Sequence, residues 1–157
     1  MHTDTHQRLL AYIAEHAIVC EHLIFDQSTH SVAEAALAAG VTAEDFIKSI
    51  CMTTKDGRII VAIVKGEDRA DRSAVQQLLG LAKLSIASPD EMLAMTGYPA
   101  GGMPPFGFDA TFVMDERVFE KAIIYGGGGG DRALIRIAPS EIQRTNGAQV
   151  ARIRKQL

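Results

Sequence analysis

The chain has no tryptophan, only two cysteines, and no apolar run long enough to cross a membrane. A spanning helix needs about 20 predominantly apolar residues, and the segment Met1 to His6 lacks the basic and apolar regions of a secretory signal. These absences predict a cytoplasmic protein without a membrane partner. Cys20 and Cys51 form no CxxC pair, so we expect both thiols to be free and to serve in packing.

An excess of positive charge is also missing. The chain carries 16 Lys and Arg against 19 Asp and Glu, which gives a net charge of −3. Proteins that bind nucleic acid without regard to sequence are usually strongly basic, so no DNA partner is expected, although a local nucleic-acid contact stays open. Basic residues gather in two groups, and solvated surface is the favoured interpretation of both. The groups are Lys65, Arg69 and Arg72, and Arg152, Arg154 and Lys155.

The motifs of several enzyme classes are absent. There is no GxSxG, GxxxxGK[ST] or HExxH, and the glycine run 126–130 lacks the context of a dinucleotide-binding loop. The five histidines show no metal-ligand spacing, so we expect each to be an ordinary polar or partly buried residue; they are His2, His6, His16, His22 and His30. No histidine partner is visible for Cys51 as a nucleophile, and the adjacent Asp115 and Glu116 should diverge and form no carboxylate dyad.

The chain does contain enough apolar residues for one core. Its 157 residues are 47% hydrophobic, which predicts one domain over 1–157. Apolar spacing and capping residues predict helices over 5–18, 32–39, 74–79 and 89–95, and another that Pro139 opens. Strands are predicted over 19–25, 46–53, 58–64, 83–87, 111–114, 122–125 and 133–137. Because regular βαβ alternation is missing, we expect an α+β or mixed α/β fold, with a mixed, barrel-like sheet flanked by short helices.

Two features could carry chemistry. The loop 96–107 alternates glycine with proline, which shapes a backbone with exposed N–H groups, although a tight connection without function explains the composition equally well. Lys48 lies among apolar residues of a predicted strand, so its ammonium must reach the surface or meet an anionic or carbonyl partner in a cleft. Such groups can orient a substrate and stabilise an oxyanion, which suits an already activated substrate such as an aminoacyl ester.

Several segments, in this order and spacing, carry a family resemblance over nearly the whole chain. They are the helix Ser31 to Gly40 with Val41-Thr42 and Phe46-Ile47-Lys48, Leu78-Leu79-Gly80 before Ser88-Pro89-Asp90-Glu91, Thr96-Gly97-Tyr98 with Gly101-Gly102 and Pro105-Phe106-Gly107, and Tyr125 with its glycines before Ala138-Pro139-Ser140-Glu141. With these segments the chain resembles the YbaK/prolyl-tRNA synthetase-associated family of aminoacyl-tRNA editing domains.

The resemblance implies a deacylase that acts in trans on mischarged tRNA, commonly prolyl-tRNA carrying a wrong small amino acid. Lys48 matches the family's strand lysine and would hold the tRNA 3′ end or the aminoacyl group. The segment Gly101 to Pro105 matches the family's GxxxP loop, and its main chain, including Gly101 and Gly102, would position the ester and the attacking water. No metal or organic cofactor is implied, and the partner is the acceptor end of an aminoacyl-tRNA.

Further substrate contacts are expected around these catalytic positions. Ile50 and Met52 would form apolar walls if they share the side of Lys48, and Gly127 and Gly128 would line the same pocket. Met103, Pro105 and Phe106 would add contacts from the loop. The amino acid stays open, because Ser49, Leu134 and Arg136 depart from the residues of other branches and no histidine follows His30.

Two other functions stay open at this stage. A domain of the same fold could bind a tRNA 3′ end or a small molecule without hydrolysis, and a protein-interaction domain is the third hypothesis. A weak homodimer also stays open, because sequence does not distinguish core from interface residues. If the loop acts through its backbone, a β-branched residue at Gly101 or Gly102 should reduce activity more than stability.

Overall fold

A computed structural model describes residues 2–156. The helices are α1 (His2–Glu15), α2 (Val32–Ala39), α3 (Arg72–Leu79), α4 (Pro89–Thr96) and α5 (Pro139–Asn146), with short 3₁₀ helices η1 (Ala43–Asp45), η2 (Ala100–Gly102) and η3 (Glu116–Glu120). The strands are β1 (Cys20–Ile24), β2 (Ile47–Thr54), β3 (Ile59–Lys65), β4 (Leu84–Ile86), β5 (Thr111–Asp115), β6 (Ile124–Gly127), β7 (Ala133–Ile137) and β8 (Gln149–Ala151). Over this part of the chain, no helix combines the length and apolar character needed to cross a bilayer.

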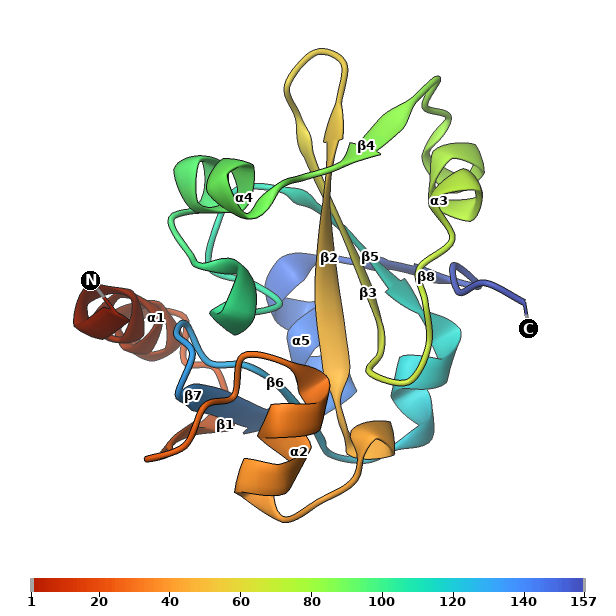
Figure 1. The fold of residues 1–157 in the computed structure, drawn as a ribbon. Coiled ribbons are helices and arrows are strands. Elements are labelled where there is room, and N and C mark those ends of the chain that lie inside the picture. The colour runs from red at the N-terminus through yellow and green to blue at the C-terminus, as the bar shows by residue number, and fades with distance from the viewer. Residues whose placement is uncertain (1, 157) are drawn as a thin grey trace.

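The strands form two sheets (Figure 1). One has the order β4-β2-β3-β5-β8, in which β2 and β3 are an antiparallel hairpin while β3–β5 and β5–β8 are parallel pairs. The other is antiparallel, in the order β1-β7-β6. The predicted mixed α/β class is confirmed, but the prediction of one barrel-like sheet is wrong. The sheets do not close into a barrel, because β6 forms its ladder with β7 and not with β2. An isolated bridge between Phe46 and Tyr125 connects β6 to the residue before β2.

Capping residues in the sequence correctly predict where α2 and α4 begin. Ser88 and Glu91 form the predicted capping box of α4, and Ser31 accepts the Glu34 N–H at the start of α2. Helix α3 begins at Arg72, two residues before the predicted start at residue 74, because the Asp71 side chain accepts the N–H groups of Ser73 and Ala74.

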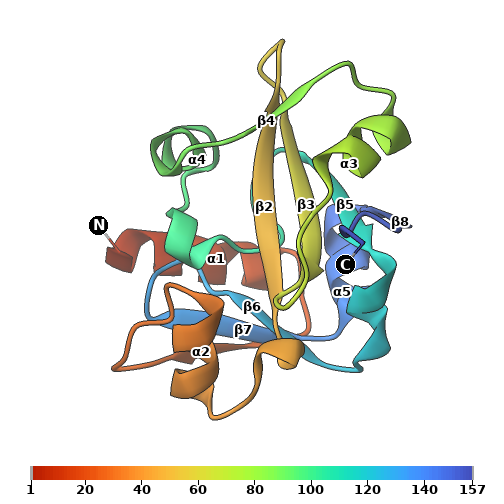
Figure 2. The same ribbon diagram turned by 45° about the vertical axis from the view of Figure 1, so that its right-hand side comes forward.

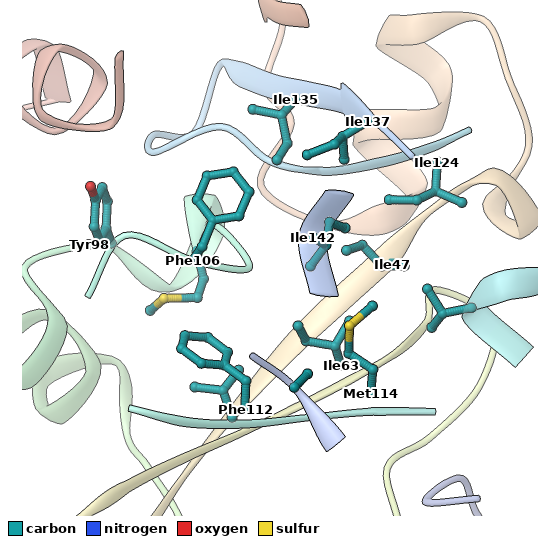
Figure 3. Close-up of a cluster of buried hydrophobic side chains, with 14 of the residues drawn as sticks. Ile47, Ile63, Tyr98, Phe106, Phe112, Met114, Ile124, Ile135, Ile137 and Ile142 are labelled. Atoms are coloured by element: carbon teal, nitrogen blue, oxygen red, sulfur yellow. The ribbon is translucent and has the colours of Figure 1, made fainter. Parts of the chain in front are cut away.

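The main hydrophobic core lies between the two sheets (Figure 3). Isoleucines of β6 and β7 face Ile63 of β3 and Phe112 and Met114 of β5, while Ile142 of α5 and Phe106 fill the space beside them. A second cluster, which includes Met52, lies on the opposite face of the larger sheet, under α3. Because that sheet is covered on both faces, β3 is buried over residues 60–65, in agreement with its continuous apolar sequence.

Candidate active site

A cavity of about 310 Å³ opens at the junction of the two sheets. Its walls come from β2, the residues around the start of α2, the η2 loop and β6. Five residues predicted from the sequence line it together, although up to 79 positions separate them in the chain: Lys48, Ile50, Gly101, Met103 and Gly127. The fold therefore brings the strand lysine and the GxxxP loop to one site.

The edge of β2 forms one wall of this cavity. β4 pairs only with residues 52–54 of β2, so residues 47–51 have no strand partner from β4. The Thr54 N–H donates to the Arg58 carbonyl across the hairpin, and the alternation of an antiparallel ladder then directs the backbone groups of Ser49 and Cys51 away from β3. The Cys51 carbonyl indeed accepts the Ala87 N–H at 3.0 Å. The main chain of Ser49 is thus turned toward the cavity.

The two glycine-rich loops pack backbone against backbone behind the cavity. The Gly129 N–H donates to the Gly102 carbonyl at 2.8 Å. A Cβ added to Gly102 would lie 2.6 Å from the carbonyl carbon of Gly130, and one added to Gly127 would lie 2.7 Å from that of Met103. Close approach, more than positive φ, explains why these positions are glycine, since within the run only Gly129 has a left-handed φ, of +94°.

Gly101 has a different neighbour. A Cβ at this position would meet the imidazole of His30, at 2.7 Å from its Cε1 atom. His30 is exposed and lines the cavity with its chain neighbours Thr29 and Ser31. Sequence reasoning missed these three residues as site residues because they are remote from the loop in the chain. Ser31 was visible in the sequence only as the N-cap of α2, which gives no sign of a place in the site.

Lys48 is half-buried at the cavity wall. Burial lowers the pKa of its ammonium because hydration is lost, the positive charge of Arg69 lowers it further, and Asp68 acts in the opposite direction. Within residues 2–156, no carboxylate forms an ion pair with this ammonium. A partly dehydrated cation that forms no direct ion pair with a carboxylate favours the binding of an anionic ligand.

The remaining predicted site residues lie away from the cavity lining. Met52 shares the face of Lys48 and Ile50, but it lies farther along β2, where β4 pairs with the strand, and it is fully buried in the cluster under α3. Phe106 is buried in the main core and stacks on Tyr12, with ring centroids 5.9 Å apart. Three further residues are buried outside the lining: Gly102, Pro105 and Gly128. Adjacency along the loop suggested direct contacts, but the loop turns into the core after Met103.

Two chemical options can be assessed from the geometry. Cys51 lines the cavity, but burial raises the pKa of its thiol to about 12, so the nucleophilic thiolate is scarcely populated at neutral pH. This supports the packing role expected from the sequence. Among the described residues, no three His, Cys, Asp or Glu side chains gather in a group that could hold a metal ion.

The fold defines a single mixed α/β domain with a cavity at the junction of two sheets, and comparison with known proteins identifies its family. The family model for the aminoacyl-tRNA editing domain matches residues 26–145, so the chain belongs to this family. The resemblance inferred from the sequence is confirmed. With it, the predicted activity class, hydrolysis of the ester in mischarged tRNA, is also confirmed.

Individual relatives cover most of the chain. The multifunctional Ser/Thr-tRNA deacylase ProXp-y of Escherichia coli (strain K12) is 28% identical over 142 residues, covering 83% of this chain and 82% of that protein. YwhH of Bacillus subtilis, which is uncharacterized, is 26% identical over 128 residues, covering 80% and 81%. A solved structure described as a candidate trans-editing enzyme for prolyl-tRNA synthetase superposes with a TM-score of 0.88 at 28% identity, covering 97% and 98%. The chain matches only 17% of the proline–tRNA ligase of Nitratidesulfovibrio vulgaris (strain DP4).

Proposed function

We propose that this domain acts in trans on mischarged prolyl-tRNA and removes a small wrong amino acid from its 3′ end. The observation that carries the proposal is that Lys48 and the main chain around Gly101 line one cavity. Two relatives support the substrate class: one is named as a Ser/Thr-tRNA deacylase, and the other is described as a candidate trans-editing enzyme for prolyl-tRNA synthetase. We place the reaction in the cytoplasm, as the sequence predicts.

In this proposal the reaction is a simple ester hydrolysis. Water attacks the aminoacyl carbonyl carbon and the bond from that carbon to the ribose oxygen breaks. One proton of the water goes to the ribose oxygen, which recovers its hydroxyl, and the other is released to solvent as the amino acid leaves as a carboxylate. The ammonium of Lys48 binds a phosphate near the 3′ end, and the backbone of Gly101 and Met103, together with the Ser49 edge of β2, orients the ester. Positioned backbone N–H groups stabilise the oxyanion that forms during the attack.

The size of the cavity supports a small aminoacyl group. Its volume of about 310 Å³ is at the lower end of the roughly 300–1,000 Å³ typical of small-molecule sites. Val32, Met92 and Leu134 give it apolar walls, and Thr29, Ser31 and Ser49 add hydroxyl-bearing residues. This combination suits a short side chain, with or without a hydroxyl group.

The test is release of amino acid from a panel of mischarged tRNAs by the wild-type protein and a Lys48→Ala variant. Loss of one charged contact to substrate should reduce kcat/KM by roughly 10- to 100-fold. Lys55→Ala is the matched control, because Lys55 is exposed in the turn between β2 and β3, and it should retain wild-type activity.

Each outcome has a separate meaning. Equal release by Lys48→Ala and wild type would remove Lys48 from its role. No release from any substrate would contradict the proposed activity of this chain, and binding of mischarged tRNA without release would favour the non-catalytic binding module.

A further inference from the structure

The fold joins two groups of basic residues that are far apart in the sequence. The Asp71 N–H donates to the Ile153 carbonyl at 2.7 Å, and the Lys155 N–H donates to the Arg69 carbonyl at 2.8 Å. An antiparallel bridge between Ala70 and Arg154 lies between these two bonds. Figures 1 and 2 show the result, in which the chain end after β8 runs beside the connection from β3 to α3.

Carboxylates neutralise two of the arginines on this part of the surface. Arg117 pairs with Asp68 at 2.8 Å, and Arg154 pairs with Asp115 at 3.1 Å. By contrast, in the chain from 2 to 156 no carboxylate pairs with Arg69, Arg152 or Lys155, which are all exposed. We call these three residues the tail cations; they leave unbalanced positive charge on a protein whose net charge is −3.

The surface that carries them is shaped and held in place. Arg152 and Lys155 line a hollow of about 380 Å³ together with Arg117, Arg154 and Gln156 and with Asp68, whose carboxylate pairs with Arg117. The buried carboxylate of Asp115 fixes this segment by accepting the Ile153 and Arg154 N–H groups at 2.8 and 3.0 Å. The tail cations are therefore presented by an ordered backbone.

This surface continues toward the active site. Lys48 lies opposite Val64 in the hairpin, and the chain from Val64 leads within five residues to Arg69. The charges of Arg69 and Asp68 both affect the pKa of the Lys48 ammonium, so Arg69 lies close enough to Lys48 for their charges to interact. A ligand whose end enters the cavity at Lys48 can extend over Arg69 to the hollow at Arg152 and Lys155.

We propose that the tail cations bind phosphates of the acceptor stem of the tRNA whose 3′ end occupies the cavity. This inference rests on the proposed function and adds a second contact region to it. The regularly spaced phosphates of a stiff helix can meet several separate exposed cations, and contacts of this kind fix the position and orientation of a nucleic acid. In this proposal Arg69 from one sequence group and Arg152 and Lys155 from the other form one docking surface.

The test compares the double variant Arg152→Gln/Lys155→Gln with the control Lys55→Gln/Lys83→Gln, which removes the same charge from exposed positions on the hairpin turn and beside β4. Two substrates are used: a mischarged tRNA, and the same amino acid on a CCA trinucleotide without a stem. The double variant Arg152→Gln/Lys155→Gln is called the tail variant. On the tRNA it should show a KM about three- to tenfold higher than that of wild type, with kcat unchanged. The expected effect is modest because exposed ionic contacts are individually weak. On the trinucleotide it should equal wild type.

Binding of uncharged tRNA, measured against salt concentration, tests the inference without catalysis. The slope of log K against log salt should be shallower by about 2 in the tail variant and unchanged in the control. Equal slopes in all proteins, or equal KM changes in the tail and control variants, would overturn the inference. Arg69→Gln provides a second, single-site variant, with an expected slope change of about 1. Hydrolysis of neither substrate by wild type would contradict the proposed function, while the slopes would still decide the docking surface.

Discussion

Gly101 and Gly102 are neighbours in the GxxxP loop, yet alanine should affect them in opposite ways. A Cβ on Gly102 would lie 2.5 Å from the carbonyl oxygen and 2.6 Å from the carbonyl carbon of Gly130. Carbon atoms pack best about 3.5–4.0 Å apart, so the two loops would have to separate by roughly 1 Å. The Gly129–Gly102 hydrogen bond would be strained by that movement. We expect Gly102→Ala to lower the free energy of unfolding by about 3 kcal/mol.

At Gly101 the obstacle is a side chain. The new Cβ would meet the ring of His30, which is exposed and can rotate away. We expect Gly101→Ala to lower the free energy of unfolding by no more than about 1 kcal/mol. It should nevertheless reduce deacylation, because the displaced imidazole changes the cavity mouth. The sequence-based expectation of a larger effect on activity than on stability is thus kept for Gly101 and reversed for Gly102.

Thermal unfolding and deacylation by the same preparations test this contrast. For a chain of this length, about 3 kcal/mol corresponds to a fall in Tm of roughly 6–12 °C. The double variant Gly101→Ala/His30→Ala removes the clash and should recover activity relative to Gly101→Ala, which measures the coupling directly. A Gly102→Ala protein as stable as wild type would refute the packing argument, and absence of recovery in the double variant would refute the role of His30.

Three further predictions concern Cys51, Glu141 and Asp115. Cys51→Ala should keep deacylation within about twofold of wild type, because the thiol is protonated, while urea unfolding shows a loss of about 1 kcal/mol. Arg144 and the Val19 N–H hold the pKa of Glu141 at about 2, below its usual 4.5, so Glu141 stabilises the fold above pH 4.5 and this contribution disappears as the pH falls toward 2. Glu141→Gln should therefore lower stability by roughly 1–2 kcal/mol at pH 7, with little difference from wild type near pH 2. Asp115→Ala should lower stability by about 3 kcal/mol in urea unfolding, because several N–H groups lose their buried acceptor.

Local chemistry made much of the fold predictable. Helix α2 has the predicted bounds, α4 starts at the predicted residue, and the hairpin of β2 and β3 follows its apolar runs closely. The pairing of strands within each sheet was harder to predict from the sequence, because it depends on residues that are distant in the chain. The short strand β8 was missed since its three residues pair in parallel with β5 and are mostly exposed, which leaves no apolar pattern.

The candidate site was predictable where a residue conflicts with its local surroundings. Lys48 in an apolar strand and glycines beside prolines are visible as such in sequence. His30 carries no such conflict, because its importance comes from the contact with Gly101 that only the fold creates. Met52 and Phe106 show the opposite error, since the position of Met52 along β2, where β4 pairs with the strand, and the turn of the loop at Phe106 place them in the core.

The position of the cavity between two sheets also determines when during folding the site can exist. Its walls include residues from Thr29 to Leu134, and no sequence-local unit contains them all. The β2–β3 hairpin can form from neighbouring segments, whereas the meeting of the sheets requires pairing across most of the chain, which is intrinsically slow. On the ribosome, a growing chain would have its strand lysine long before it has a pocket. We therefore expect the cavity to form late in the folding of the domain.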